Sequence, residues 1–127
     1  MGYVRAGARE KIFFEPSSVR AAVVTCGGLC PGMNSVIREI CCTLYRLYGA
    51  SEVWGVRYGY EGFYSTQSTP VRLTPDVTKN CHSLGGTVLG SSRGGFDLTR
   101  IVDGIVRHGF NQVYIIGGDG THRGAQA

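Results

Sequence analysis

No apolar stretch in this 127-residue sequence approaches the ~18 residues that a membrane span requires. The first residues, Met1 to Ala6, contain neither the apolar segment of a signal peptide nor the serine or threonine of a myristoylation motif. Five cysteines, two of them adjacent, fit reduced thiols better than a disulfide framework. These absences predict a soluble protein of a reducing compartment, and we expect it in the cytoplasm.

Charge and proline are also scarce. Charged residues make up 17% of the chain and hydrophobic residues 43%, which excludes an extended disordered chain. The net charge of +4 is too small to argue for nucleic acid as a partner, which would need a clustered basic stripe with aromatic residues. With only four prolines and no collagen period, the 20 glycines are expected to occupy specific turns. This net charge does not exclude anionic small molecules as ligands.

The order of apolar patterns predicts strands alternating with helices. Residues 1–18 show no period and are expected to form a lead-in arm, whereas 19–127 carry the pattern of a folded domain. We expect strands at 19–25, 52–57, 85–90 and 112–116, and helices at 33–48, from 75–77 and at 97–108. A last helix is expected to begin near Thr121, which would cap it. This alternation is typical of an α/β fold with a mainly parallel, Rossmann-like sheet and flanking helices.

Two of the expected strands end in glycine pairs directly before a helix. Gly27-Gly28 and Gly117-Gly118 would both lie at the carboxyl edge of the sheet, where α/β folds bind ligands. Backbone N–H groups without a nearby Cβ can approach an anion, and the dipole of the helix from about Asn34 would favour a phosphate there. One such turn alone is equally well explained as a tight connection. Two at the same edge favour phosphate binding.

The segment between these turns carries Arg93, and the second turn carries Asp119. A guanidinium in a flexible turn can bind a polyphosphate through paired N–H donors. A carboxylate between glycines can hold Mg²⁺ through water, although it can also simply cap the last helix. The sequence contains neither GxxxxGK[ST] nor GxGxxG, so the P-loop and the dinucleotide fingerprint are excluded. The phosphate site must be of another kind.

Three motifs in order resemble the nucleotide-binding half of phosphofructokinases. They are CGGLCPGMN at 26–34, LGSSRGG at 89–95 and GGDGT at 117–121. The likeness to plant-type ATP-dependent members covers nearly the whole chain, including Arg5 to Lys11 and the loop from Tyr58 to Tyr64. The resemblance implies phosphoryl transfer from Mg-ATP to the 1-hydroxyl of fructose 6-phosphate in glycolysis, by a homo-oligomer.

The resemblance also implies roles for individual residues. Gly28 would approach a phosphate, Arg93 would bind the triphosphate and Asp119 would be the Mg²⁺-linked carboxylate. The turn under the nucleotide would be formed by Gly118, Gly120, Thr121 and Gly124. Pyrophosphate-dependent members carry Asp where this chain has Gly120. Because a second carboxylate would repel an α-phosphate, glycine there favours ATP.

Several family features have no counterpart in the chain. The catalytic stretch of Thr-Ile-Asp-Asn-Asp type, whose first Asp acts as the base, is expected beyond Ala127. Residues 19–127 are therefore expected to be a partial nucleotide-binding domain, truncated at the C-terminus and inactive alone, because phosphoryl transfer needs both substrates positioned. Leu29 replaces an Asp of many bacterial members, and Cys42 stands one turn after Arg38 where they carry an effector-binding arginine. Bacterial-style effector control is therefore not expected.

Other functions remain open at this point. One is a pyrophosphate-dependent phosphofructokinase, and another is a lipid or nicotinamide-dinucleotide kinase, in which Gly-Gly-Asp-Gly-Thr also follows a strand. A third is a non-catalytic nucleotide-binding or assembly module. Cys26 and Cys30 flank the first turn, where a lowered thiol pKa would permit oxidation, but inert packing is the expectation. The aromatic residues from Tyr58 to Tyr64 are expected to pack the loop on the sheet, with contact to adenine as the alternative.

Overall fold

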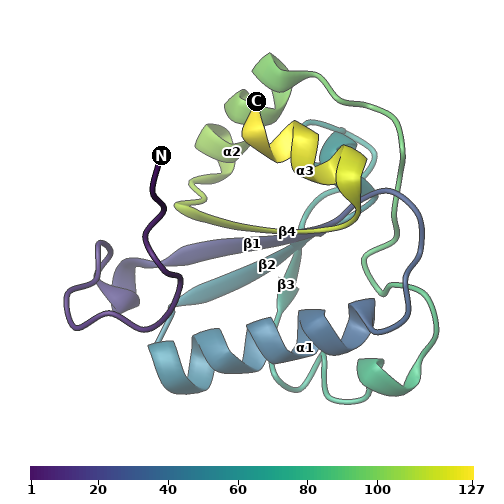
Figure 1. The fold of residues 1–127 in the computed structure, drawn as a ribbon. Helices are drawn as coiled ribbons and strands as arrows, with labels where there is room; N and C mark the ends of the chain where they lie inside the picture. Colours follow the sequence, from purple (N-terminus) through teal and green to yellow (C-terminus); the bar gives the residue numbers. More distant parts are fainter.

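The computed structural model describes all residues from Met1 to Ala127. Four strands form one sheet in the order β3-β2-β1-β4 (Figure 1). β1 (Arg20–Thr25) pairs in parallel with β2 (Glu52–Val56) and with β4 (Gln112–Ile116). β3 (Val71–Leu73) pairs antiparallel with β2. The mainly parallel α/β fold predicted from the alternation of strands and helices is confirmed.

Helices cover both faces of the sheet. α1 (Met33–Thr43), which continues as a π-helical turn over Leu44–Tyr48, lies on one face. α2 (Leu98–His108) and α3 (Asp119–Gln126) lie on the other face (Figure 1). None of these helices is long and apolar enough to cross a membrane.

The core is divided by the central strand β1, whose side chains alternate between the two helical layers. Ala21 and Val23 belong to the cluster beneath α1, and Ala22 and Val24 belong to the cluster beneath α2. All four are completely buried, as expected for a strand between two parallel neighbours. β1 therefore places its carboxyl end, and the glycine turn after it, on a rigid support.

The helix boundaries follow the capping signals of the sequence. α2 begins after Asp97, whose side chain accepts a hydrogen bond from the N–H of Arg100 at 3.2 Å. Gly109 follows α2 with a left-handed φ of 71°, and Gly49 ends the first helix with a φ of 78°. The predicted helices at 33–48 and 97–108 are thus confirmed, α2 starting one residue later with Asp97 as its cap.

Three local predictions are wrong, and one strand was missed. The segment 85–90 is a turn rather than a strand, and no helix forms at 75–77, where the chain makes successive turns. The short strand β3 was not predicted, because three residues are too few to show a period. α3 begins at Asp119, so Thr121 lies buried inside the helix instead of capping it.

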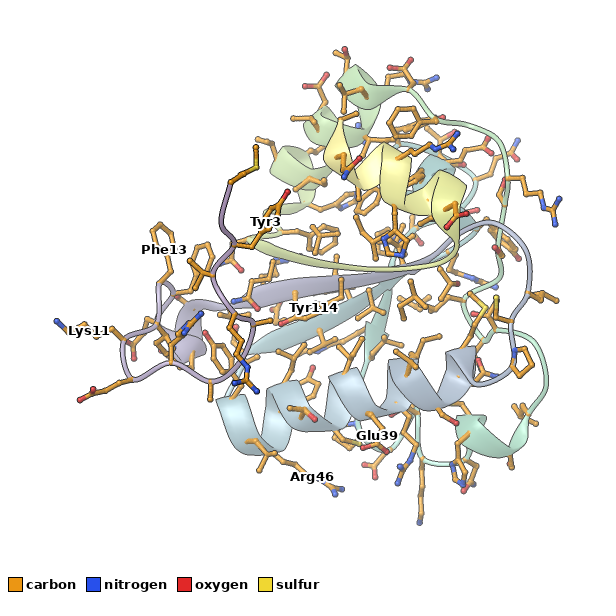
Figure 2. All side chains as sticks on the ribbon, viewed as in Figure 1. Tyr3, Lys11, Phe13, Glu39, Arg46 and Tyr114 are labelled. Carbon is orange, nitrogen blue, oxygen red and sulfur yellow. The ribbon has the colours of Figure 1, made fainter.

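Figure 2 shows how the periphery surrounds this core. Residues 1–15 form neither helix nor strand, and a 3₁₀ turn follows at Pro16–Ser18. Lys11 and Phe13 project from this arm away from the sheet (Figure 2). Tyr114 of β4 packs on the α1 side, while Glu39 and Arg46 lie on the outer face of the first helix (Figure 2). The arm thus leaves the carboxyl ends of the parallel strands free.

Candidate functional site

A cleft of about 620 Å³ opens where β1 and β4 end. All seven residues that the sequence predicted for the site lie in its wall: Gly28, Arg93, Gly118, Asp119, Gly120, Thr121 and Gly124. The wall is completed by Cys26, Gly27, Tyr60, Ser92, Gly94, Phe96 and Arg123. Three segments far apart in the sequence therefore converge on one space.

Arg93 and Gly28 meet at one side of the cleft. A Cβ placed on Gly28 would lie only 2.9 Å from Nη2 of Arg93, so the guanidinium occupies the space that a side chain would fill. Arg93 is exposed and forms no ion pair with an acidic residue. Its charge is therefore available to an anionic ligand at the first glycine turn.

Hydrogen bonds tie the segment that carries Arg93 to the end of β1. The N–H of Gly27 donates to the carbonyl oxygen of Ser92 at 3.0 Å. The hydroxyl of Ser91 donates in return to the carbonyl oxygen of Gly27. Deeper in the fold, the hydroxyl of Thr25 donates to the carbonyl oxygen of Gly90 at 2.8 Å. Two of the three motifs thus form one connected wall.

The opposite wall is the first turn of α3. Gly118 precedes this helix without a side-chain cap, and Asp119 is its first residue. The first N–H groups of a helix have no intrahelical acceptor and carry the positive end of its dipole. No atom lies within 4 Å of a Cβ built on Gly120, so this part of the wall is open. The helix end therefore offers free N–H donors beside a carboxylate.

The start of α1, whose dipole was predicted to favour a phosphate at the first glycine turn, does not line the cleft. Met33 and Asn34 at its start are buried and do not line the cleft. The side chain of Asn34 donates to the carbonyl oxygen of Leu84 at 3.1 Å and accepts from the N–H of Val88 at 2.7 Å. Asn34 therefore organises the 84–88 turn, and the helix whose start lines the cleft is α3.

An aromatic pair lies beside α3. The hydroxyl of Tyr60 donates to the carbonyl oxygen of Thr121 at 2.6 Å, and its ring packs edge to face with Phe96 at 5.4 Å between centroids. A Cβ on Gly124 would lie 2.9 Å from Phe96 and 3.0 Å from Tyr60, so only glycine lets the helix approach this closely. Burial raises the pKa of Tyr60, as does Cys26, which keeps the hydroxyl a donor. Because Tyr60 is buried and Phe96 is exposed, Phe96 provides most of the accessible aromatic surface in the cleft wall.

The remaining residues that the sequence singled out differ in position. Phe63 is buried in the core, as expected for packing of the loop on the sheet. Burial raises the pKa of the Cys26 thiol to about 11, opposite to the lowering that would make it reactive. Two neighbours of Thr121 that have no predicted role also differ: Arg123 lines the cleft, whereas His122 is exposed outside it. Phe96 was missed, because one aromatic residue after two glycines has no spacing that marks it.

Charge in the cleft suits a metal-bound polyphosphate. Arg93 and Arg123 line the cleft together with one carboxylate, that of Asp119. No group of three His, Cys, Asp or Glu side chains gathers to hold a metal by itself. A divalent cation bound at Asp119 therefore needs ligand oxygens or water for its other positions, as Mg²⁺ has when it binds with phosphates.

A second hollow of about 540 Å³ adjoins the cleft. The two share part of their walls, namely Gly27, Gly28, Ser92 and Arg93. Its far side is formed by the 85–91 turn and Leu29. The guanidinium of Arg93 consequently stands at the boundary between two adjacent spaces.

Comparison with known proteins agrees with this arrangement. The model of the phosphofructokinase family matches residues 20–127. The chain belongs to the phosphofructokinase family. It is 58% identical over 125 residues to ATP-dependent 6-phosphofructokinase 2 of Arabidopsis thaliana, covering 98% of this chain and 28% of that protein. It is 49% identical over 122 residues to the ATP-dependent 6-phosphofructokinase of Borreliella burgdorferi, covering 95% and 27%. The predicted resemblance is confirmed.

Solved phosphofructokinases share the fold. The enzyme of Pichia pastoris in the T-state superposes with a TM-score of 0.77 at 26% identity, over 91% of this chain and 13% of that one. A pyrophosphate-dependent phosphofructokinase from Marinobacter aquaeolei superposes with a TM-score of 0.73 at 17% identity, over 85% and 28%, which shows the fold alone. The chain spans about a quarter of the length of the curated relatives it matches.

Proposed function

We propose that this chain forms the phosphoryl-donor site of an ATP-dependent phosphofructokinase, which transfers a phosphoryl group from Mg-ATP to the 1-hydroxyl of fructose 6-phosphate. The convergence of Arg93, Gly28 and the start of α3 on one cleft carries the proposal. The identity of 58% to a relative named for ATP dependence supports the choice of donor.

The triphosphate would bind between the two walls. Arg93 provides paired guanidinium donors, and the free N–H groups at the start of α3 face the same space. Mg²⁺ fits at Asp119, where it would neutralise charge on the phosphate oxygens. Because Arg93 also borders the second hollow, the terminal phosphate would lie where an acceptor can approach it.

The open wall at Gly120 supports ATP over pyrophosphate as the donor. The space around a Cβ at Gly120 is open, so an aspartate would fit there and would add a carboxylate next to Asp119. Two adjacent carboxylates would repel an α-phosphate. The Tyr60–Phe96 pair offers a surface on which an adenine ring can pack.

Binding and turnover are separable in this chain. Asp119 is the one carboxylate in the cleft wall, and as the Mg²⁺ ligand it cannot also activate the acceptor hydroxyl. We therefore propose that the base lies outside 1–127 and that the chain alone binds nucleotide without turnover. Assembly as a homo-oligomer and a cytoplasmic location remain predictions.

Isothermal titration with Mg-ATP tests the proposal. Arg93→Ala and Asp119→Ala should each raise Kd about tenfold or more, because the first removes a charged hydrogen bond to phosphate and the second removes the carboxylate that holds Mg²⁺. Arg72→Ala serves as the control, because Arg72 is exposed on β3 outside the cleft. Magnesium pyrophosphate should bind more weakly than Mg-ATP. Equal binding by both cleft variants and the parent would refute the proposal, and tighter pyrophosphate binding would reassign the donor.

A further inference from the structure

Thr25 is a polar residue in the centre of the fold. It is the last residue of β1 and is completely buried. Its hydroxyl donates to the carbonyl oxygen of Gly90 at 2.8 Å and lies 3.0 Å from Oγ1 of Thr87. Neither bond contributes to the sheet. A buried hydroxyl without a hydrogen-bond partner lowers the stability of the fold. The fold is therefore more stable when the segment that holds Gly90 and Thr87 stays in place beside Thr25.

That segment, 87–93, has no helix or strand of its own and ends at Arg93. Its exposed half is attached only at the surface, through Gly27 and Ser91. Two buried side chains hydrogen-bond to the segment: Asn34 accepts from the N–H of Val88, and Thr25 bonds at two points, one of them at Gly90, which lies nearer to Arg93. The hydroxyl thus joins the segment to the rigid centre of the sheet.

Arg93 has no partner of its own that fixes its direction, so its direction depends on how the segment 87–93 is attached. Its side chain is exposed, and no acidic residue pairs with it. Its reach to Gly28 is therefore set by the backbone from which it projects. A guanidinium that must meet phosphate oxygens loses affinity when its supporting segment is free to move, because ordering it then costs binding energy.

We propose that Thr25 is a positioning residue that acts through Arg93. Its hydroxyl clamps 87–93 to the end of β1 and so presents the guanidinium to the phosphates of the ligand. The clamp itself is a property of the free chain, whereas its consequence for nucleotide affinity rests on the proposed function.

Three variants separate positioning from stability. Thr25→Val keeps the shape and burial of the side chain but removes the hydroxyl, and Thr25→Ser restores the hydroxyl. Thr78→Val is the matched control, since Thr78 is equally buried but its hydroxyl bonds within its own turn, to Thr74, outside the cleft. The first measurement is amide hydrogen exchange in the free chain. In Thr25→Val, the amide hydrogens of residues 87–93 should exchange about tenfold faster than in Thr25→Ser and Thr78→Val. This is the effect expected from loss of a buried hydrogen bond.

The second measurement is the Kd for Mg-ATP. Thr25→Val should raise it about three- to tenfold, the range expected for a lost hydrogen bond, with rescue by Thr25→Ser. In an Arg93→Ala background the same substitution should add nothing, because the guanidinium it positions is gone. Unchanged exchange in 87–93, or a full additional loss of affinity beside Arg93→Ala, would overturn the proposal. If the parent chain fails to bind Mg-ATP, the proposed function fails while the exchange measurement still decides the clamp.

Discussion

Replacing Gly28 by alanine should separate the function of the cleft from the stability of the fold. The added Cβ would lie 2.9 Å from Nη2 and 3.8 Å from Cζ of Arg93. Gly28 does not have a positive φ, so alanine causes no backbone strain. The atom that must move is the end of a long, exposed side chain. The Arg93 side chain therefore moves away from residue 28, and no core side chain has to change its packing.

The two expected magnitudes differ widely. The free energy of unfolding should change by less than ~0.5 kcal/mol, as for other substitutions away from the core. Loss of a charged hydrogen bond from Arg93 to phosphate costs ~1.5–3 kcal/mol, which raises the Kd for Mg-ATP roughly 10- to 150-fold. Urea denaturation gives the first quantity and isothermal titration gives the second.

Gly94→Ala is the matched control for this substitution. Gly94 lines the same cleft, but no atom lies within 4 Å of a Cβ built there. Its Kd should stay within about twofold of the parent's, since no contact is disturbed. Equal affinity of Gly28→Ala and the parent would refute the assigned contact between Gly28 and Arg93. A loss as large in Gly94→Ala would show that any methyl group in this wall blocks the ligand.

Two further predictions concern the fold. Gly104→Ala should lower the free energy of unfolding, measured by urea denaturation, by about 2–3 kcal/mol. Its Cβ would lie 2.2 Å from the backbone oxygen of Phe63, and neither backbone can move without disturbing its own packing. An unchanged urea midpoint would contradict the packing of α2 on the 59–63 turn. Burial raises the pKa values of Cys26 and Cys41 from 9.0 to about 11, so both thiols ionise more readily in the unfolded chain. Their contribution to stability should be complete below pH 9 and should fall as the pH rises from about 9 to about 11, which can be followed by the melting temperature. A melting temperature that stays constant over this pH range, as in Cys26→Ser, would argue against the burial of Cys26.

The elements that could be predicted are those whose signals are local. β1 is a continuous β-branched and alanine run because both its faces are covered, and its burial shows this directly. The ends of the helices followed from Gly49, Asp97 and Gly109, each of which acts within its own turn. The convergence of the glycine motifs followed from strand direction alone, since parallel strands end at one edge.

The failures arise where long-range contacts override local pattern. The run at 85–90 has the pattern of a strand. Its backbone groups at Val88 and Gly90, however, hydrogen-bond to the side chains of Asn34 and Thr25 instead of to a neighbouring strand. Asn34, at the start of the helix after the first glycine turn, bonds to Leu84 instead of lining the cleft, which no local signal indicates. In the cleft wall Phe96 packs against Tyr60, which lies far earlier in the chain, and local spacing does not reveal such a contact.

Both glycine turns and Arg93 are proposed to bind the phosphates of the same ligand. Amide chemical-shift mapping with Mg-ATP tests this most directly. The N–H signals of Gly28, Gly94 and Gly120 are expected to shift in parallel and to fit a single Kd. Shifts confined to one of these segments, or fitted by unrelated dissociation constants, would contradict it.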